Sequence, residues 1–149
     1  MRMEKSVVIA RPVEDVWTFM TNLDNFRRVS LSGSEFRQSS PGPLGVGATV
    51  QSHRLVLGRF DIRLQAFTVT EYEPNRTFAM NVRIGLARQP GTHRFTLEPI
   101  REGTRVTRSI EMDLRSGLRP FQAILARGLG LAWRRELARL KRLVEVGAK

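Results

Sequence analysis

The chain has 149 residues, of which 41% are hydrophobic, and this length suits one domain with a sizeable core rather than two. It contains no cysteine, which excludes a disulfide framework and thiolate zinc sites. The formal net charge is +11, but the basic residues are spread over nearly every segment and no nucleic-acid recognition motif accompanies them, so a specific nucleic-acid partner is not expected.

A short strand and two short helices are predicted at the start of the chain. Ser6–Ala10 is short and rich in β-branched residues, as strands are. Pro12 suits the first turn of a helix, because its missing N–H would be unpaired there. The apolar residues that follow recur at i, i+3, i+4 and i+7 on one helical face: Val13, Val16, Trp17 and Met20. Asn22 can cap a second helix, whose apolar residues repeat every three positions: Leu23, Phe26 and Val29.

The middle of the chain predicts an antiparallel meander. From Ser30 the apolar pattern has a period of two and is broken by turn signals. Ser40–Gly47 is dense in proline and glycine and predicts a loop. The strands expected after this loop are Thr49–Leu57, Arg59–Glu73, Thr77–Ile84, Thr92–Leu97 and Thr104–Leu114.

The last segment, Gly117–Val146, predicts a long amphipathic helix. Its apolar residues follow one stripe: Leu118, Phe121, Leu125, Leu129, Ala132, Trp133, Leu137, Leu140 and Val144. Gly128 and Gly130 lie inside this helix, where each glycine costs about 1 kcal/mol relative to alanine. They should therefore allow a close backbone approach or mark a bend. We expect Trp17 and Trp133 to be buried, because each lies on the apolar stripe of its helix.

Four motifs in this order resemble the START-related superfamily of polyketide cyclases, dehydrases and lipid-transport proteins (SRPBCC). They are I-x-R-P-x-E-D-V-W at Ile9–Trp17, G-x-G at Gly45–Gly47, V-x-E-Y-E-P-N at Val69–Asn75 and L-x-R-L-K-R-L-V-E at Leu137–Glu145. The resemblance covers the whole chain and implies an α+β helix-grip fold. In that fold a curved seven-stranded antiparallel sheet surrounds a long C-terminal helix, and two short helices lie between strands 1 and 2.

The resemblance also implies a cavity between sheet and helix that binds a hydrophobic or amphipathic small molecule, lipid-like or polyketide-like. Two alternatives stay open, since fold alone does not select a function. One is a polyketide cyclase or dehydrase resembling an aromatase. The other is an interaction module that uses the basic C-terminal helix, where Arg134, Arg135, Arg139, Lys141 and Arg142 gather. Homodimer formation and weak contact with an anionic surface stay open as well.

Strand and helix periodicity predict the apolar lining of such a cavity, because alternate strand residues face one side. The expected residues are Phe60, Ile62, Leu64, Phe78, Met80, Val82, Phe95, Leu97, Ile110, Met112, Leu125 and Leu129.

Both histidines are predicted to point inward. His53 shares a face with Leu55 and Leu57, and His93 shares one with Phe95 and Leu97. Each is either a half-buried histidine bonded to a backbone carbonyl or a ligand-binding or catalytic group. Two histidines without a clear carboxylate partner fall short of the three protein ligands of a catalytic zinc site, so no metal is expected.

Arg108 is the charged residue whose strand position places it among apolar neighbours. Burial of an unpaired guanidinium is costly, so an inward Arg108 should meet a carboxylate, and Glu136 in the apolar arc of the terminal helix is the internal candidate. A β-bulge or snorkelling to the cavity mouth would instead turn Arg108 outward. If it points inward, we expect Arg108 to anchor the polar end of the ligand, directly or through Glu136, and to favour an anion.

If the protein is an enzyme, the sequence offers few candidate catalytic side chains. The catalytic candidates are His53, His93, Arg108 and Glu136, with Tyr72 as a further acid or base. No nucleophile elbow, phosphate-binding loop or dinucleotide fingerprint is present, so no cofactor is expected. The sequence shows no secretory signal and no transmembrane segment, which favours a cytoplasmic protein.

Overall fold

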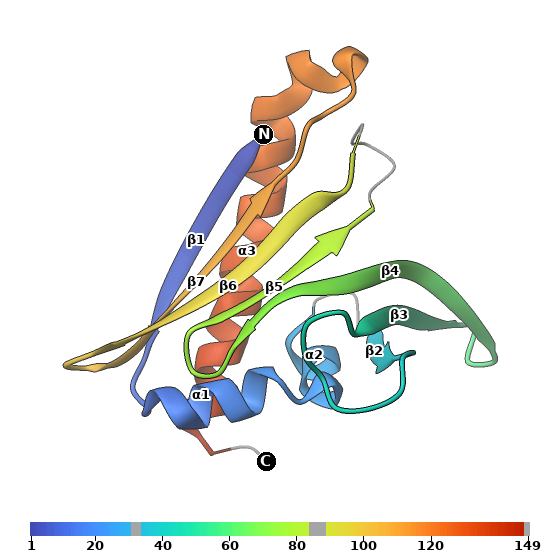
Figure 1. The fold of residues 1–149 in the computed structure, drawn as a ribbon. Coiled ribbons are helices and arrows are strands. Elements are labelled where there is room, and N and C mark those ends of the chain that lie inside the picture. The colour runs from blue at the N-terminus through green and yellow to red at the C-terminus, as the bar shows by residue number, and fades with distance from the viewer. Residues whose placement is uncertain (31–33, 84–88, 148–149) are drawn as a thin grey trace.

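The computed structural model describes residues 1–30, 34–83 and 89–147, without the side chains of residues 55–56 and 61–64. In this part of the chain seven strands form one curved sheet in the order β1-β7-β6-β5-β4-β3-β2, and every neighbouring pair is antiparallel (Figure 1). The strands are β1 (Arg2–Ile9), β2 (Glu35–Gln38), β3 (Thr49–Val56), β4 (Phe60–Glu73), β5 (Thr77–Val82), β6 (Gly91–Ile100) and β7 (Gly103–Glu111).

The helices take the places that the sequence predicts. Two short helices, α1 (Val13–Met20) and α2 (Leu23–Val29), lie between β1 and β2, and the long helix α3 (Gln122–Glu145) ends the fold. This arrangement confirms the α+β helix-grip fold. The segment before α3 is a 3₁₀ helix, η1 (Ser116–Phe121), rather than the first turns of one continuous α-helix. Pro120 lies in η1, and a proline lacks the N–H that an α-helical interior needs.

Strand β1 begins at Arg2, earlier than the predicted Ser6, because its whole length pairs with β7. Arg2 pairs with Glu111 at one end, and Ile9 pairs with Thr104 at the other. The charged residues near the start of β1 are exposed, while Met3 between them is buried. A search for runs of β-branched residues misses this first half of β1, because charged residues interrupt it. The predicted end of β5 at Ile84 lies outside the described residues.

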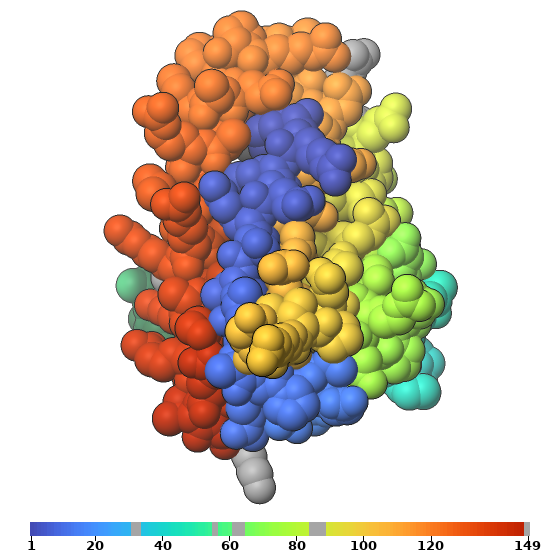
Figure 2. Space-filling view, turned by 90° about the vertical axis from the view of Figure 1, so that its left-hand side faces the viewer, coloured from blue at the N-terminus to red at the C-terminus, as the bar shows by residue number. Residues whose placement is uncertain are grey.

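Helix α3 packs along the sheet through one apolar face. Its buried side chains are Trp133, Leu137, Leu140 and Val144, which recur at helical spacing. Seen from the side, the helix lies next to β1 along the length of the molecule (Figure 2). Gly130 faces β1, where an added Cβ would lie 3.1 Å from Cε of Lys5, whereas a Cβ at Gly128 would meet no atom within 4 Å. Of the two glycines, only Gly130 therefore marks a close approach.

The C-terminal end of α3 is tied to the end of β1 by polar contacts. The backbone N–H of Ala10 donates to Oε2 of Glu145 at 2.8 Å, and Nζ of Lys141 donates to the carbonyl oxygen of Val8 at 2.9 Å. Nζ of Lys141 also donates to Oε2 of Glu145 at 2.6 Å, and the bond from Ala10, followed by this one, lowers the pKa of Glu145. These bonds fix which residues of α3 lie opposite the middle of the sheet.

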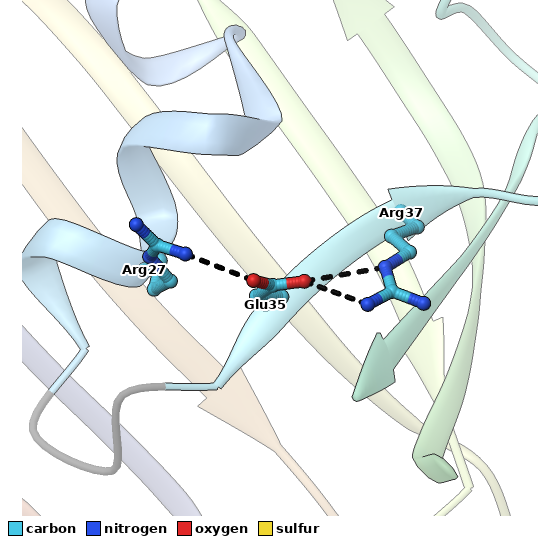
Figure 3. Close-up of polar contacts among 3 residues, drawn as sticks. All are labelled: Arg27, Glu35 and Arg37. Atoms are coloured by element: carbon cyan, nitrogen blue, oxygen red, sulfur yellow. Dashed lines mark hydrogen bonds and ion pairs between the residues drawn. The ribbon is translucent and has the colours of Figure 1, made fainter. Parts of the chain in front are cut away.

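Helix α2 contacts β2 through a pair of aromatic rings and through an ion pair. Phe26 and Phe36 are 5.3 Å apart between ring centroids. On the exposed side, Glu35 accepts hydrogen bonds from Arg27 at 2.9 Å and from Arg37 at 2.8 Å (Figure 3). The bond from Arg37, followed by that from Arg27, lowers the pKa of Glu35. Helix α2 thereby closes one end of the space inside the sheet.

The buried apolar side chains that the structure describes form two clusters. The larger one contains Trp17 and joins α1, the sheet and the C-terminal half of α3, while the smaller one joins Met3, Ile110 and Trp133. Trp17 is 7% exposed and Trp133 is 3% exposed, which confirms the prediction that both are buried.

Candidate functional site

A cavity of about 320 Å³ lies inside the sheet, where the two clusters meet. Its walls come from α2, from six of the strands described and from α3. The lining side chains are mostly apolar: Leu23, Phe26, Phe36, Val50, Gln65, Phe67, Phe78, Met80, Val82, His93, Phe95, Arg108, Ile110, Met112, Leu129 and Trp133.

A smaller hollow of about 100 Å³ adjoins this cavity on the side of α1 and α2. The two spaces share four lining residues: Phe26, Phe36, Phe95 and Arg108. Glu136 lines the smaller hollow, as do the polar side chains of Asn25 and Ser30. Arg108 therefore stands between the two spaces.

Arg108 and Glu136 form the ion pair that the strand and helix positions predict. Nη1 of Arg108 donates to Oε1 of Glu136 at 2.8 Å, and their side chains are only 16% and 14% exposed. Burial lowers the pKa of Arg108, but Glu136 opposes this shift through its charge and its hydrogen bond. An arginine stays charged in proteins, so the pair is a buried cation bonded to a carboxylate.

The guanidinium of Arg108 also lies over aromatic rings. Its Cζ atom is 4.2 Å from the ring centroid of Trp133 and 5.4 Å from that of Phe95. Contacts of this kind stabilise a partly desolvated cation. Nη1 and Nε of Arg108 have protein acceptors, whereas Nη2 donates to no residue that the structure describes.

His93 is bonded to Arg108 and stacked on α3. Nε2 of His93 accepts a 2.8 Å hydrogen bond from Nε of Arg108. Its ring lies nearly parallel to that of Trp133, with 5.3 Å between centroids and 10° between planes. Burial, followed by the positive charge of Arg108, lowers the pKa of His93 well below its usual value of 6.5. His93 is therefore neutral at physiological pH.

The structure brings eight of the thirteen residues expected at the ligand site to the cavity: Phe78, Met80, Val82, Phe95, Arg108, Ile110, Met112 and Leu129. Leu97 is instead packed in the larger apolar cluster, and Leu125 is half-exposed near the start of α3, where it does not line the cavity. The side chains of Ile62 and Leu64 lie outside the described residues.

Phe60 is not at the cavity. It is 52% exposed and begins β4 at the tip of the β3–β4 hairpin, which extends away from α3 in Figure 1. The inward-facing residues farther along β4 are Gln65, Phe67 and Val69, whose positions are odd. The extra residue that β4 carries between Arg63 and Gln65 changes the alternation, so the face of Phe67 and Val69 cannot be read from the position of Phe60.

His53 does not line the cavity either. Val50 and Ser52 are the buried residues of β3, and the pairing of β3 with β4 shifts register between Ser52 and His53. Ser52 pairs with Gln65 and His53 pairs with Arg63, so the extra residue lies in β4. The regular alternation of β3 therefore turns His53 to the face opposite the buried Val50 and Ser52. Tyr72 also lies elsewhere, with its ring 5.3 Å from that of Trp17 between centroids.

Seven lining residues were not anticipated from the sequence. They are Leu23, Phe26, Phe36, Val50, Gln65, Phe67 and Trp133. Phe26 belongs to the apolar repeat of α2 and Trp133 to the stripe of α3, so periodicity marks both as buried without placing them at a cavity. The loop predicted at Ser40–Gly47 lines no part of this cavity, and the N–H of Gly47 donates to the carbonyl oxygen of Val69 on β4 at 2.9 Å.

Within the described ranges, no three histidine or acidic side chains gather in a way that could hold a metal ion. None of the helices described is long and apolar enough to cross a membrane.

Comparison with known proteins gives a family match over nearly the whole chain. The profile of the family described as polyketide cyclase / dehydrase and lipid transport matches residues 1–145. A search of curated proteins gave no match.

Solved structures share the fold at low sequence identity. TTHA0849 from Thermus thermophilus superposes with a TM-score of 0.75 at 14% identity, and the match covers 100% of both chains. For MLL2253 from Mesorhizobium loti the TM-score is 0.71 at 17% identity, again over 100% of both chains. The Aha1 dimer from Colwellia psychrerythraea gives a TM-score of 0.69 at 20% identity, over 100% of this chain and 99% of that one. At such identities the likeness shows the fold alone, while the profile match shows that this chain belongs to the polyketide cyclase / dehydrase and lipid transport family.

Proposed function

We propose that this protein binds a hydrophobic or amphipathic small molecule in the cavity between the sheet and α3. The observation that carries the proposal is an apolar cavity of about 320 Å³ with a buried guanidinium at its polar end. Cavities of about 300–1,000 Å³ with a few fixed polar groups are typical ligand sites. The apolar walls supply affinity, and Arg108 orients the molecule through the Nη2 group that has no described acceptor.

Native mass spectrometry of freshly purified protein tests this proposal directly. We expect a bound small molecule that leaves on denaturation and can then be identified. For protein stripped of this molecule, the neutral fluorescent probe N-phenyl-1-naphthylamine should bind with increased emission. Failure of this probe to bind the stripped, folded protein would contradict the proposal.

A matched pair of variants on α3 locates the probe. Leu129 lines the cavity, whereas Leu131 is 57% exposed on the outer side of the same helix. Leu129→Trp should fill part of the cavity and weaken probe binding at least tenfold, while Leu131→Trp should leave binding unchanged. Equal effects of the two substitutions would place the probe outside the cavity.

The second candidate is a cyclase or dehydrase that uses the same cavity. The hydrogen-bonded pair of Arg108 and His93 favours it, because donors aimed at a carbonyl oxygen stabilise the negative charge that develops during enolisation. Incubation with a synthetic poly-β-ketone thioester tests this candidate: an enzyme releases a product lighter by one water, and Arg108→Met abolishes the release. A binding protein returns the thioester unchanged.

A further inference from the structure

The polar end of the cavity presents hydrogen-bond donors. A guanidinium only donates, so in the 2.8 Å bond between Arg108 and His93 the acceptor is Nε2 of His93. The neutral imidazole then carries its proton on Nδ1, and this N–H has no acceptor among the described residues. Nη2 of Arg108 also has no hydrogen-bond acceptor among the described residues. A ligand group that fits this end is therefore a hydrogen-bond acceptor.

The charges of the described residues at this end balance each other. Among the described residues that line the cavity and the smaller hollow, Arg108 and Glu136 are the only charged ones, and they are bonded to each other at 2.8 Å. A carboxylate placed on Nη2 would add a second negative charge to a guanidinium that is already paired. Burial of an uncompensated charge among apolar walls is costly, whereas a carbonyl oxygen accepts the same hydrogen bond without adding charge.

We propose that Glu136 determines ligand specificity: by neutralising Arg108 it excludes anions, so that the cavity takes an apolar molecule whose polar group is an uncharged acceptor, such as a ketone, ester or amide carbonyl. This inference rests on the proposed binding function. It departs from the expectation drawn from the sequence alone, that Arg108 favours an anion, because Glu136 neutralises the charge of Arg108 and no other described residue that lines this end is charged.

The net charge of +11 does not reverse this selection. The excess positive charge lies mostly on exposed arginines, and at 0.1 M salt exposed charges are screened over about 10 Å. Surface charge of this kind raises the encounter rate of an anion with the molecule. It does not remove the local cost of a second carboxylate beside Glu136.

Three probes of equal chain length test the inference: undecane, 2-undecanone and undecanoate. Each competes with N-phenyl-1-naphthylamine at about pH 8, where the fatty acid is ionised. For the wild-type protein we expect 2-undecanone to bind about threefold to tenfold more tightly than undecane, the gain of a buried neutral hydrogen bond. Undecanoate should bind more weakly than 2-undecanone by at least tenfold.

Two variants identify the cause of this preference. Glu136→Gln keeps the shape and a hydrogen-bond acceptor but removes the negative charge, so the order should invert and undecanoate should bind more tightly than 2-undecanone. Arg108→Met removes the donor, so 2-undecanone should lose its advantage over undecane. Because each result is a ratio within one variant, a uniform loss of binding from partial unfolding cancels.

The outcomes separate this inference from the binding function. If the wild-type protein binds undecanoate as tightly as 2-undecanone, the inference fails while the cavity remains a binding site. The same holds if Glu136→Gln leaves the order unchanged. If neither the fluorescent probe nor any of the three chains enters the folded wild-type protein, the binding function fails as well.

Discussion

At the scale of single residues, the position of Arg108 follows from strand alternation and its partners follow from tertiary structure. Val106 and Ile110 on the same face are buried, so alternation places Arg108 inside the sheet. The period of α3 brings Glu136 to the same depth, which is why the sequence predicts their pairing. The stacking of His93 on Trp133 depends on how the helix lies across the sheet, and no local pattern encodes that placement.

Loss of either Arg108 or Glu136 alone should destabilise the fold more than loss of both. Removal of one partner from a buried ion pair leaves the other charge uncompensated and typically costs about 3–5 kcal/mol, whereas apolar replacement of both is often neutral. We expect Arg108→Met to lower the free energy of unfolding by a large part of this amount. The double variant Arg108→Met with Glu136→Leu should recover most of the loss.

Chemical denaturation of the wild type, both single variants and the double variant measures this coupling. Losses that simply add in the double variant would show that the two side chains stabilise the fold independently, contrary to the geometry of the pair.

The lowered pKa of His93 predicts a dependence of stability on pH. In the unfolded chain this histidine takes up a proton near its usual value of 6.5, whereas in the folded protein it stays neutral to a lower pH. The unfolded state therefore binds more protons as the pH falls below that value, and the free energy of unfolding falls with it, by at most about 1.4 kcal/mol per pH unit. The contribution is complete at neutral pH.

Urea denaturation at several pH values between neutrality and the lower limit of folding measures this slope. His93→Gln keeps a hydrogen-bond acceptor for Arg108 but has no proton to bind, so its slope should be smaller. An identical slope in wild type and variant would show that other groups cause the pH dependence.

At the scale of elements, periodicity predicts the order of strands and helices, but it fails where pairing is irregular. The register shifts between Ser52 and His53, and again between Val69 and Glu71. Both extra residues lie in β4, so a constant alternation carried along β4 from Phe60 gives the wrong face beyond the first bulge. In β3 the alternation is regular, and His53 lies on the face opposite Val50 and Ser52. The segments β6 and β7 pair without such a shift, and there the inward positions of His93 and Arg108 follow from the pattern.

The two glycines of α3 should respond differently to alanine. An added Cβ at Gly128 would meet no atom within 4 Å, so Gly128→Ala should gain the helix propensity of alanine, about 1 kcal/mol. At Gly130 the Cβ would lie 3.1 Å from Cε of Lys5 and 3.7 Å from Sδ of Met3, so these flexible side chains must move. We expect Gly130→Ala to gain less or to lose stability.

Thermal unfolding of the two variants and the wild type gives the comparison. A larger gain from Gly130→Ala than from Gly128→Ala would contradict the packing of α3 against β1.

At the scale of the whole molecule, the cavity depends on segments far apart in the sequence. Phe26 on α2 lies 6.3 Å from Phe95 on β6 between ring centroids, and Phe36 on β2 lies 5.9 Å from Phe67 on β4. Periodicity shows that α2 has an apolar side, but it does not show which part of the sheet that side covers. The sequence therefore predicts the residues that β5, β6, β7 and α3 contribute to the cavity better than those that α2 and β2 contribute.

A cavity that accepts a ligand couples binding to the stability of the whole fold. A molecule that binds only the folded state at a hundred times its Kd adds about 2.7 kcal/mol to the free energy of unfolding. For a chain of this length, about 1 kcal/mol corresponds to about 2–4 °C in Tm. We therefore expect saturating N-phenyl-1-naphthylamine to raise the Tm of the stripped wild-type protein by about 5–10 °C. The rise should persist in Leu131→Trp and fall by about half or more in Leu129→Trp, because only the second substitution occupies the cavity and weakens probe binding at least tenfold. A rise in Leu129→Trp equal to that of the wild type would show that the stabilising site lies elsewhere on the molecule.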